Sequence, residues 1–167
     1  DITKLDWINS QHLNNLSKES FKTHIMPFID NLGIDYSQYQ QLDELIEAMR
    51  SVKPNLQLIA QALIPYLDTF KEYDEKGVSK FLIGSEETLI LVIESLQTIK
   101  SWSEVEIDSM LVKIQEKLGL KTPQMNQPIR IALTGSMQSP SLGLTIKLMG
   151  RNKSIELLNK ALKFITK

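Results

Sequence analysis

The chain contains no cysteine, only two histidines and no long apolar run. The missing cysteines exclude a disulfide framework and any thiolate metal site, and they favour a reducing, cytoplasmic compartment. His12 and His24 have no second histidine or carboxylate at a metal-binding helical spacing, so we expect them at the surface or at helix caps rather than on zinc. No segment approaches the roughly 20 apolar residues that a membrane-spanning helix needs. We therefore expect no metal and no membrane partner.

Motifs of catalysis and of secretion are also missing. Residues 1–7 show no basic region followed by an apolar run, so no signal peptide is readable, and the absent initiator methionine suggests further sequence upstream. Gly135 and Gly143 flank serines, but the Gly-Lys-Ser ending of a phosphate-binding loop is absent and no strand precedes it. Glu86 with Glu87, and the acidic residues of 43–47, predict solvated helix faces rather than a buried acid-base pair.

What the chain does contain is helical periodicity, in a 167-residue sequence that is 42% hydrophobic. The stripes that predict core-facing helix sides are Leu42, Leu45, Ile46 and Met49; Leu89, Val92, Ile93 and Leu96; Ile107, Met110, Leu111, Ile114 and Leu118; and Ile155, Leu158, Leu162 and Ile165. No convincing alternating strand pattern is present. The charged residues 71–80 are interpreted as the connection between two helical clusters. The sequence therefore predicts an all-α fold of two consecutive small helical bundles, residues 1–66 and 67–167.

Helix boundaries are marked by polar residues and glycines. Ser103 and Glu106 have the spacing of a capping box, and Thr122 before Pro123 predicts an N-cap followed by the first helical residue. Glycines follow four apolar-periodic stretches, where left-handed C-caps are expected: Gly33, Gly119, Gly135 and Gly150.

The net charge of −1 conceals a strong gradient along the chain. Residues 1–120 hold 11 Lys or Arg against 19 Asp or Glu, whereas residues 121–167 hold eight against Glu156 alone. Such a chain can present a basic face to phosphates while its acidic part faces elsewhere. A surplus of lysines at the ends of solvated helices remains the alternative.

Residues 130–143 stand out as an apolar helix that ends on a glycine and continues into a short polar loop. Pro140 stiffens this loop, and the helix that follows has backbone amides able to meet an anion or a base edge. The loop holds no nucleophile and no general base. It predicts a binding surface, for which single-stranded RNA is the natural ligand.

Four short stretches carry a resemblance to a known family. Residues 127–136 read QPIRIALTGS, residues 139–142 read SPSL, residues 4–9 read KLDWIN and residues 148–151 read LMGR. Together they resemble the C-terminal, anticodon-binding half of bacterial-type glutamyl-tRNA synthetases, from end to end of the chain. The resemblance implies an anticodon-binding fold of the α-helix-cage type.

It also implies a function. Enzymes of this class I family join glutamate to tRNA with ATP and magnesium in a separate N-terminal catalytic domain, whose HIGH and KMSKS-like motifs do not occur here. The fragment would therefore have no catalytic residue and no cofactor of its own, and its partner would be tRNA(Glu).

By position, the family's anticodon-contacting residues correspond to Arg130, Ser139, Pro140 and Leu142, and Met137 and Gln138 lie in the same loop. Arginine can stack on or hydrogen-bond an unstacked base, serine can bond a base edge, and proline with leucine offers apolar backing. The alternative for Arg130 is a helix-end arginine on the carbonyls near Gly135.

One position departs from the family pattern. In members that accept only tRNA(Glu), the helix corresponding to residues 42–52 ends with an arginine at the place of Val52, where it reads the last anticodon base. Valine cannot hydrogen-bond a base edge, so the resemblance implies a parent enzyme that also charges tRNA(Gln) with glutamate. Lys53 is the open alternative, because a one-residue shift of the helix end would bring its charge to the same base.

Two other functions fit the sequence less specifically. A helical protein-interaction module is the main alternative, and its binding should depend less on salt than binding to RNA phosphates. An independent ATP-dependent ligase is disfavoured because no nucleotide-binding loop is present.

Overall fold

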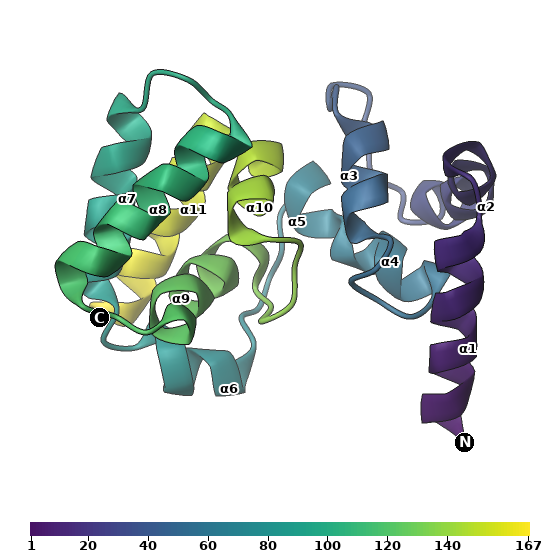
Figure 1. Ribbon diagram of the computed structural model, residues 1–167, viewed down its shortest axis with the longest axis horizontal. Coiled ribbons are helices and arrows are strands. Elements are labelled where there is room, and N and C mark those ends of the chain that lie inside the picture. Colours follow the sequence, from purple (N-terminus) through teal and green to yellow (C-terminus); the bar gives the residue numbers. More distant parts are fainter. The chain divides into compact units, whose positions relative to one another are not determined.

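The computed structural model describes residues 1–167 and is built of helices and connecting turns, which confirms the all-α fold class (Figure 1). The chain divides into two compact units, Asp1–Phe70 and Lys71–Lys167. The division lies a few residues beyond the boundary expected from the sequence. None of the helices combines the length and apolar character needed to span a bilayer.

The first unit is organised around one helix. Its elements are α1 (Ile2–Asn15), α2 (Lys18–Asp30), α3 (Leu42–Met49), α4 (Leu56–Ala62) and the short α5 (Ile64–Leu67). Phe21, Ile25 and Ile29, which follow each other at four-residue spacing on α2, are fully buried. This face of α2 packs against α3 and α4, which contribute Leu45 and Ile59 to the core. Helix α1, in contrast, buries only Leu13.

The second unit surrounds α9. Its elements are α6 (Glu75–Gly77), the π-helix η1 (Val78–Leu82), α7 (Glu86–Thr98), α8 (Glu104–Leu118), α9 (Thr122–Thr134), α10 (Leu142–Met149) and α11 (Arg151–Ile165). Helix α9 contacts η1, α10, α11, α7 and α6, and every residue from Ile131 to Thr134 is buried. The C-terminal turn of α9 is thus buried on every side, whereas its first residues, Thr122 to Gln124, are exposed. The polar loop that follows α9 therefore begins from the centre of this unit.

Residues 71–80 are not a simple connection. They belong to the second unit, and their C-terminal part forms α6 and most of η1, which packs against α9. The interpretation as a linker was wrong because charge and one glycine suggested exposure. Gly77 is in fact buried, and a Cβ there would lie 2.7 Å from Ile131 Cδ1. The missing side chain allows this short segment to approach α9 closely.

The predicted apolar stripe is correct for α7, correct for α3 except that Leu42 is only half-buried, and shifted for α11. Leu89, Val92, Ile93 and Leu96 of α7 are all buried. On α11, Leu158 is buried, but Ile155 and Ile165 are only half-buried. The residues that α11 buries are Ser154, Leu157, Leu158 and Ala161. Two of these residues are small, so the hydrophobic pattern did not reveal them.

The capping predictions hold in part. Ser103 Oγ accepts from the backbone N–H of Glu106 at 3.3 Å, and Gly119 and Gly135 end α8 and α9 in the left-handed conformation. Helix α9 starts at Thr122 itself, so Lys121 rather than Thr122 is the N-cap, and Gln124 Oε1 accepts from the N–H of Lys121 at 3.2 Å. Gly150 has φ 89° and ψ 156°, which is not the left-handed helical cap expected from the sequence.

Candidate nucleic-acid interface

The polar loop between α9 and α10 spans residues 135–141 and is fixed at its start by α9. Gly135 adopts φ 73° and donates from its N–H to the carbonyl of Ile131 at 2.7 Å. Thr134 Oγ1 donates to the carbonyl of Arg130 at 2.7 Å and accepts from the N–H of Ser136 at 3.2 Å. The last turn of α9 and the first loop residues therefore form one hydrogen-bonded unit, with Arg130 at its base.

Arg130 and Ser139, predicted separately as site residues, are in direct contact. Arg130 Nε donates to Ser139 Oγ at 2.7 Å, and Arg130 Nη1 donates to Gln127 Oε1 at 3.3 Å. The guanidinium group is thus held by the loop on one side and by the preceding turn of α9 on the other. Its placement toward Ser139 and Gln127 differs from the alternative of an arginine engaged only with helix-end carbonyls.

Ser139 is also bound to the start of α10. Ser139 Oγ donates to the carbonyl of Pro140 at 2.6 Å, and Thr145 Oγ1 lies 3.1 Å from both Ser139 Oγ and that carbonyl. Thr145 is fully buried. It was not predicted from the sequence, where a threonine inside a helical segment carries no signal of its own.

The remaining predicted loop residues differ in exposure. Pro140 and Leu142 are buried, with Leu142 only 4% exposed, so they attach the loop to the interior of the second unit. Gln138 is exposed, and its backbone N–H donates to Ser136 Oγ at 3.1 Å. Met137 is half-buried beside Gly77, where a Cβ would lie 3.1 Å from Met137 Cγ. The loop therefore has an apolar base and a polar outer side.

A second segment supports the loop, and no motif in the sequence indicated it. The N–H of Asp74 donates to the carbonyl of Gly135 at 2.8 Å, while Asp74 Oδ2 accepts from the N–H of Gly77 at 2.7 Å. The ring of Tyr73 packs on Phe164 of α11 with centroids 4.9 Å apart. Burial raises the pKa of Tyr73, so its phenol stays neutral. Residues 73–77 thus hold the C-terminal end of α9 in place.

The first turn of α10 is not an open anion site, contrary to the sequence-based expectation. A Cβ on Gly143 would collide with Asp108 Oδ1, so the carboxylate of Asp108 in α8 occupies the space beside this turn. Glu104 Oε1 accepts from Ser141 Oγ at 3.4 Å. Negative groups at a helix N-terminus are stabilised by the helix dipole. The same charges repel a phosphate from this place.

Val52 and Lys53, the other predicted site residues, lie in the first unit beyond the end of α3. The helix ends at Met49 with Arg50 as C-cap, so it does not extend to Val52 as expected. The backbone N–H of Val52 donates to the carbonyl of Met49 at 3.0 Å, and both Val52 and Lys53 are half-buried. Val52 and Lys53 are therefore presented by a turn rather than by a helix.

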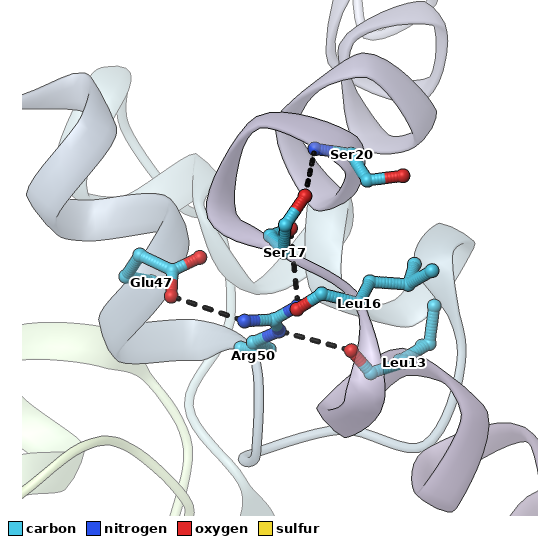
Figure 2. A network of polar contacts seen from close by, with 6 residues as sticks. All are labelled: Leu13, Leu16, Ser17, Ser20, Glu47 and Arg50. Atoms are coloured by element: carbon cyan, nitrogen blue, oxygen red, sulfur yellow. Dashed lines mark hydrogen bonds and ion pairs between the residues drawn. The ribbon is translucent and has the colours of Figure 1, made fainter.

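This turn starts from Arg50, whose side chain binds the junction between α1 and α2 (Figure 2). Arg50 Nε donates to the carbonyl of Leu13 at 3.0 Å, and Nη2 donates to the carbonyl of Leu16. Nη1 pairs with Glu47 Oε1 at 3.2 Å, and the guanidinium carbon lies 4.7 Å from the centre of the Phe21 ring. One arginine thus joins α1, α2 and α3.

The other titratable groups singled out in the sequence lie on the surface or in ion pairs. His12 and His24 are exposed, and His24 Nδ1 lies 2.6 Å from the carbonyl of Ser20. Asp43 pairs with Lys22 Nζ at 2.6 Å. No group of three or more His, Cys, Asp or Glu side chains is arranged to hold a metal ion.

The basic C-terminal part is not uniformly a surface feature. Arg151 donates through Nη1 to the carbonyl of Leu96 at 2.5 Å and through Nη2 to that of Ile99 at 2.8 Å, so it binds the C-terminal end of α7. Its guanidinium carbon also lies 5.1 Å from the centre of the Trp102 ring. Lys160, Lys163 and Lys167, in contrast, are exposed on and after α11.

Comparison with solved structures defines the class of fold. A glutamate tRNA ligase from Elizabethkingia meningosepticum, in complex with its amino acid, matches with a TM-score of 0.81 and 18% identity over 96% of this chain and 32% of that one. A glutamate-tRNA synthetase from Elizabethkingia anophelis matches with a TM-score of 0.77 and 18% identity over 95% and 31%. This chain spans about a third of the length of these enzymes and has the fold of an all-helical region within them.

The sequence match is more specific than the fold. The family described as an anticodon binding domain matches residues 11–162, which include most of both units and the loop after α9. The chain belongs to the anticodon binding domain family.

Proposed function

We propose that this chain is the anticodon-recognition part of a glutamate-tRNA ligase, and that the loop of residues 135–141 binds unpaired anticodon nucleotides of tRNA(Glu). The observation that carries the proposal is the contact of Arg130 with Ser139 at this loop, within a chain of the anticodon binding domain family. A guanidinium plane held beside polar loop atoms suits an unstacked base, which offers both a flat face and hydrogen-bonding edges.

The parent protein joins glutamate to tRNA in this proposal and works in the cytoplasm. ATP and magnesium would serve its separate catalytic domain, as the resemblance to glutamyl-tRNA synthetases implies. The chain itself contributes binding energy and selectivity.

Binding of tRNA(Glu) to the 167-residue chain across a salt series tests the proposal. Arg130→Ala should weaken binding by about 1–3 kcal/mol, since the guanidinium no longer meets a base. Lys117→Ala, which removes an exposed cation in the last turn of α8, at the opposite end of that helix from Glu104, serves as the matched control and should change the affinity little. Arg130→Lys keeps the positive charge and shows whether charge alone at this position is enough for tRNA binding. An unchanged affinity in Arg130→Ala would remove this residue from the site, and salt-insensitive binding would favour a protein partner.

Selectivity at the last anticodon base is a separate part of the proposal. With Val52 and no arginine at this place, we propose that the parent enzyme also charges tRNA(Gln) with glutamate. Charging of both tRNAs by the full-length enzyme, alone and with Val52→Arg, is the measurement. The idea is supported if the natural enzyme charges both tRNAs to a comparable extent and the Val52→Arg enzyme charges mainly tRNA(Glu). A strong preference for tRNA(Glu) in the natural enzyme ends it, and loss of that preference in Lys53→Ala would assign the base contact to Lys53.

A further inference from the structure

The hydroxyl group of Ser139 lies among three hydrogen-bonding partners. Arg130 Nε is 2.7 Å from Ser139 Oγ, the carbonyl oxygen of Pro140 is 2.6 Å away, and Thr145 Oγ1 is 3.1 Å away. A serine hydroxyl offers one hydrogen and two acceptor lone pairs. Three partners at these distances match its full capacity.

The direction of each hydrogen bond is restricted by the chemistry of the partners. Arg130 Nε can only donate and the carbonyl of Pro140 can only accept. Ser139 therefore donates to the Pro140 carbonyl at 2.6 Å, and Thr145 Oγ1 donates either to Ser139 Oγ or to the same carbonyl, each 3.1 Å away. In both arrangements Ser139 has used its only hydrogen inside the protein and has accepted the hydrogen of Arg130. It has no donor left for a base edge.

Thr145 cannot contact RNA directly because its exposed fraction is 0%. Its Oγ1 nevertheless lies within hydrogen-bonding distance of two polar loop atoms, Ser139 Oγ and the Pro140 carbonyl oxygen. Gln127 acts on the other side of the guanidinium group through its contact with Nη1. Because the group is planar, two fixed hydrogen bonds from different nitrogens set the orientation of its plane.

We propose that Ser139 and Thr145 are positioning residues, which act on the nucleotide through Arg130 and not by contact with a base. This inference rests on the proposed function, in which Arg130 meets the anticodon. It replaces the direct role of Ser139 at a base edge that the family resemblance implies.

A double-mutant cycle tests the inference on the 167-residue chain. The probe is an RNA hairpin with the anticodon stem and loop of tRNA(Glu), and the proteins are the natural chain, Ser139→Ala, Arg130→Ala and the double variant. Ser139→Ala should weaken binding about threefold to tenfold, as expected when one hydrogen bond is removed. In the Arg130→Ala background the same change should have no further effect, because a group that acts only through Arg130 has nothing left to position. Penalties that multiply in the double variant would overturn the inference, since they would mean that Ser139 touches the RNA itself.

Thr145 gives an independent arm of the test. Thr145→Val keeps the shape of the side chain and removes its hydroxyl, so binding should weaken in the natural background and not in Arg130→Ala. Thr145→Ser keeps the hydroxyl and should keep the affinity, which a purely structural role of the threonine methyl group would not allow. If thermal melting shows that Thr145→Val does not fold, the test rests on two other variants. Thr145→Ser should bind the hairpin like the natural chain, and Ser139→Ala should bind it more weakly.

The failure of the inference can be told apart from the failure of the proposed function. A natural chain that binds the hairpin no better than a hairpin with a scrambled loop would contradict the proposed function. Loop-specific binding that Arg130→Ala weakens, but that Ser139→Ala leaves unchanged, would contradict the positioning role alone.

Discussion

At the scale of single residues, close approaches between backbone and side chains shape the loop. Gly77 is the clearest case, because its Cα faces Ile131 of α9 and Met137 of the loop with no room for a methyl group. Gly143 also lies close to a side chain, but there the neighbouring atom is the terminal carboxylate oxygen of the exposed Asp108. Both residues lie in helical segments, where glycine is otherwise unfavourable.

Replacing Gly77 by alanine should destabilise the second unit. The added Cβ would meet Ile131 Cδ1 at 2.7 Å, and overpacking of this kind costs about 1–3 kcal/mol. The measurement is the free energy of unfolding in urea. Ser79→Ala, an exposed change in the neighbouring π-helix, is the control and should stay close to the natural chain. Equal stability of Gly77→Ala and the natural chain would mean that residues 73–77 are not packed against α9.

Asp108→Asn should lower stability and raise RNA affinity together. The carboxylate stabilises the first turn of α10 by roughly 0.3–1 kcal/mol, and its negative charge disfavours phosphates near the loop. Thermal melting and binding of the anticodon hairpin measure the two effects. Glu116→Gln removes a charge near the other end of α8 and should change neither quantity much. A loss of affinity in Asp108→Asn would assign this residue to the RNA contact instead.

At the scale of helices, Arg50 holds the first unit together where apolar packing is thin. Only Leu13 of α1 is buried, and carbonyls at the end of α1 and just beyond it receive hydrogen bonds from the Arg50 side chain (Figure 2). The rest of α1 carries exposed apolar residues, including Leu5 and Trp7. The attachment of α1 therefore depends on a polar contact with a residue more than thirty positions away.

Arg50→Ala should therefore detach the C-terminal end of α1 and lower the stability of the first unit by about 1.5–3 kcal/mol, the range for hydrogen bonds to a charged group. Hydrogen exchange should rise first in α1 and at the start of α2. Lys53→Ala, three residues further on, is the control for charge. Faster exchange confined to α3, with α1 still protected, would contradict this role for Arg50.

Apolar stripes in the sequence identified the helices α3, α7, α8 and α11, but local patterns revealed neither α6 and η1 nor the contacts between helices. The turn after α9 was predictable because Gly135 follows an apolar stretch. The capping role of Ser103 was predictable because its partner, Glu106, is only three residues away. The contacts of Asp74 with Gly135 and of Arg50 with the end of α1 join residues far apart in the chain, which no local pattern encodes. Small buried residues such as Ala161 also escaped, since they add little hydrophobicity to a stripe.

At the scale of the whole molecule, charge is distributed unevenly between the units. Asp1–Phe70 holds five Lys or Arg against nine Asp or Glu, and Lys71–Lys167 holds 14 against 11. The positive excess of the second unit lies toward its C-terminal end, where Arg151 is engaged inside the unit and lysines on and after α11 are exposed. These exposed lysines can attract phosphates without regard to sequence.

Neutralising Lys160, Lys163 and Lys167 together to glutamine should weaken tRNA binding and make it less dependent on salt. For every phosphate that the protein no longer neutralises, the slope of log affinity against log salt becomes shallower by about 1. Preference for the correct anticodon should remain, because phosphate contacts carry no sequence information. An unchanged slope would show that α11 does not face the RNA.

The loop after α9 is proposed to hold the anticodon nucleotides, and chemical footprinting of tRNA(Glu) tests this most directly. The natural full-length enzyme should protect the anticodon nucleotides, and the Arg130→Ala enzyme should lose that protection while contacts elsewhere on the tRNA persist. Anticodon nucleotides that remain equally reactive in the free tRNA and in its complex with the natural enzyme would contradict the proposal.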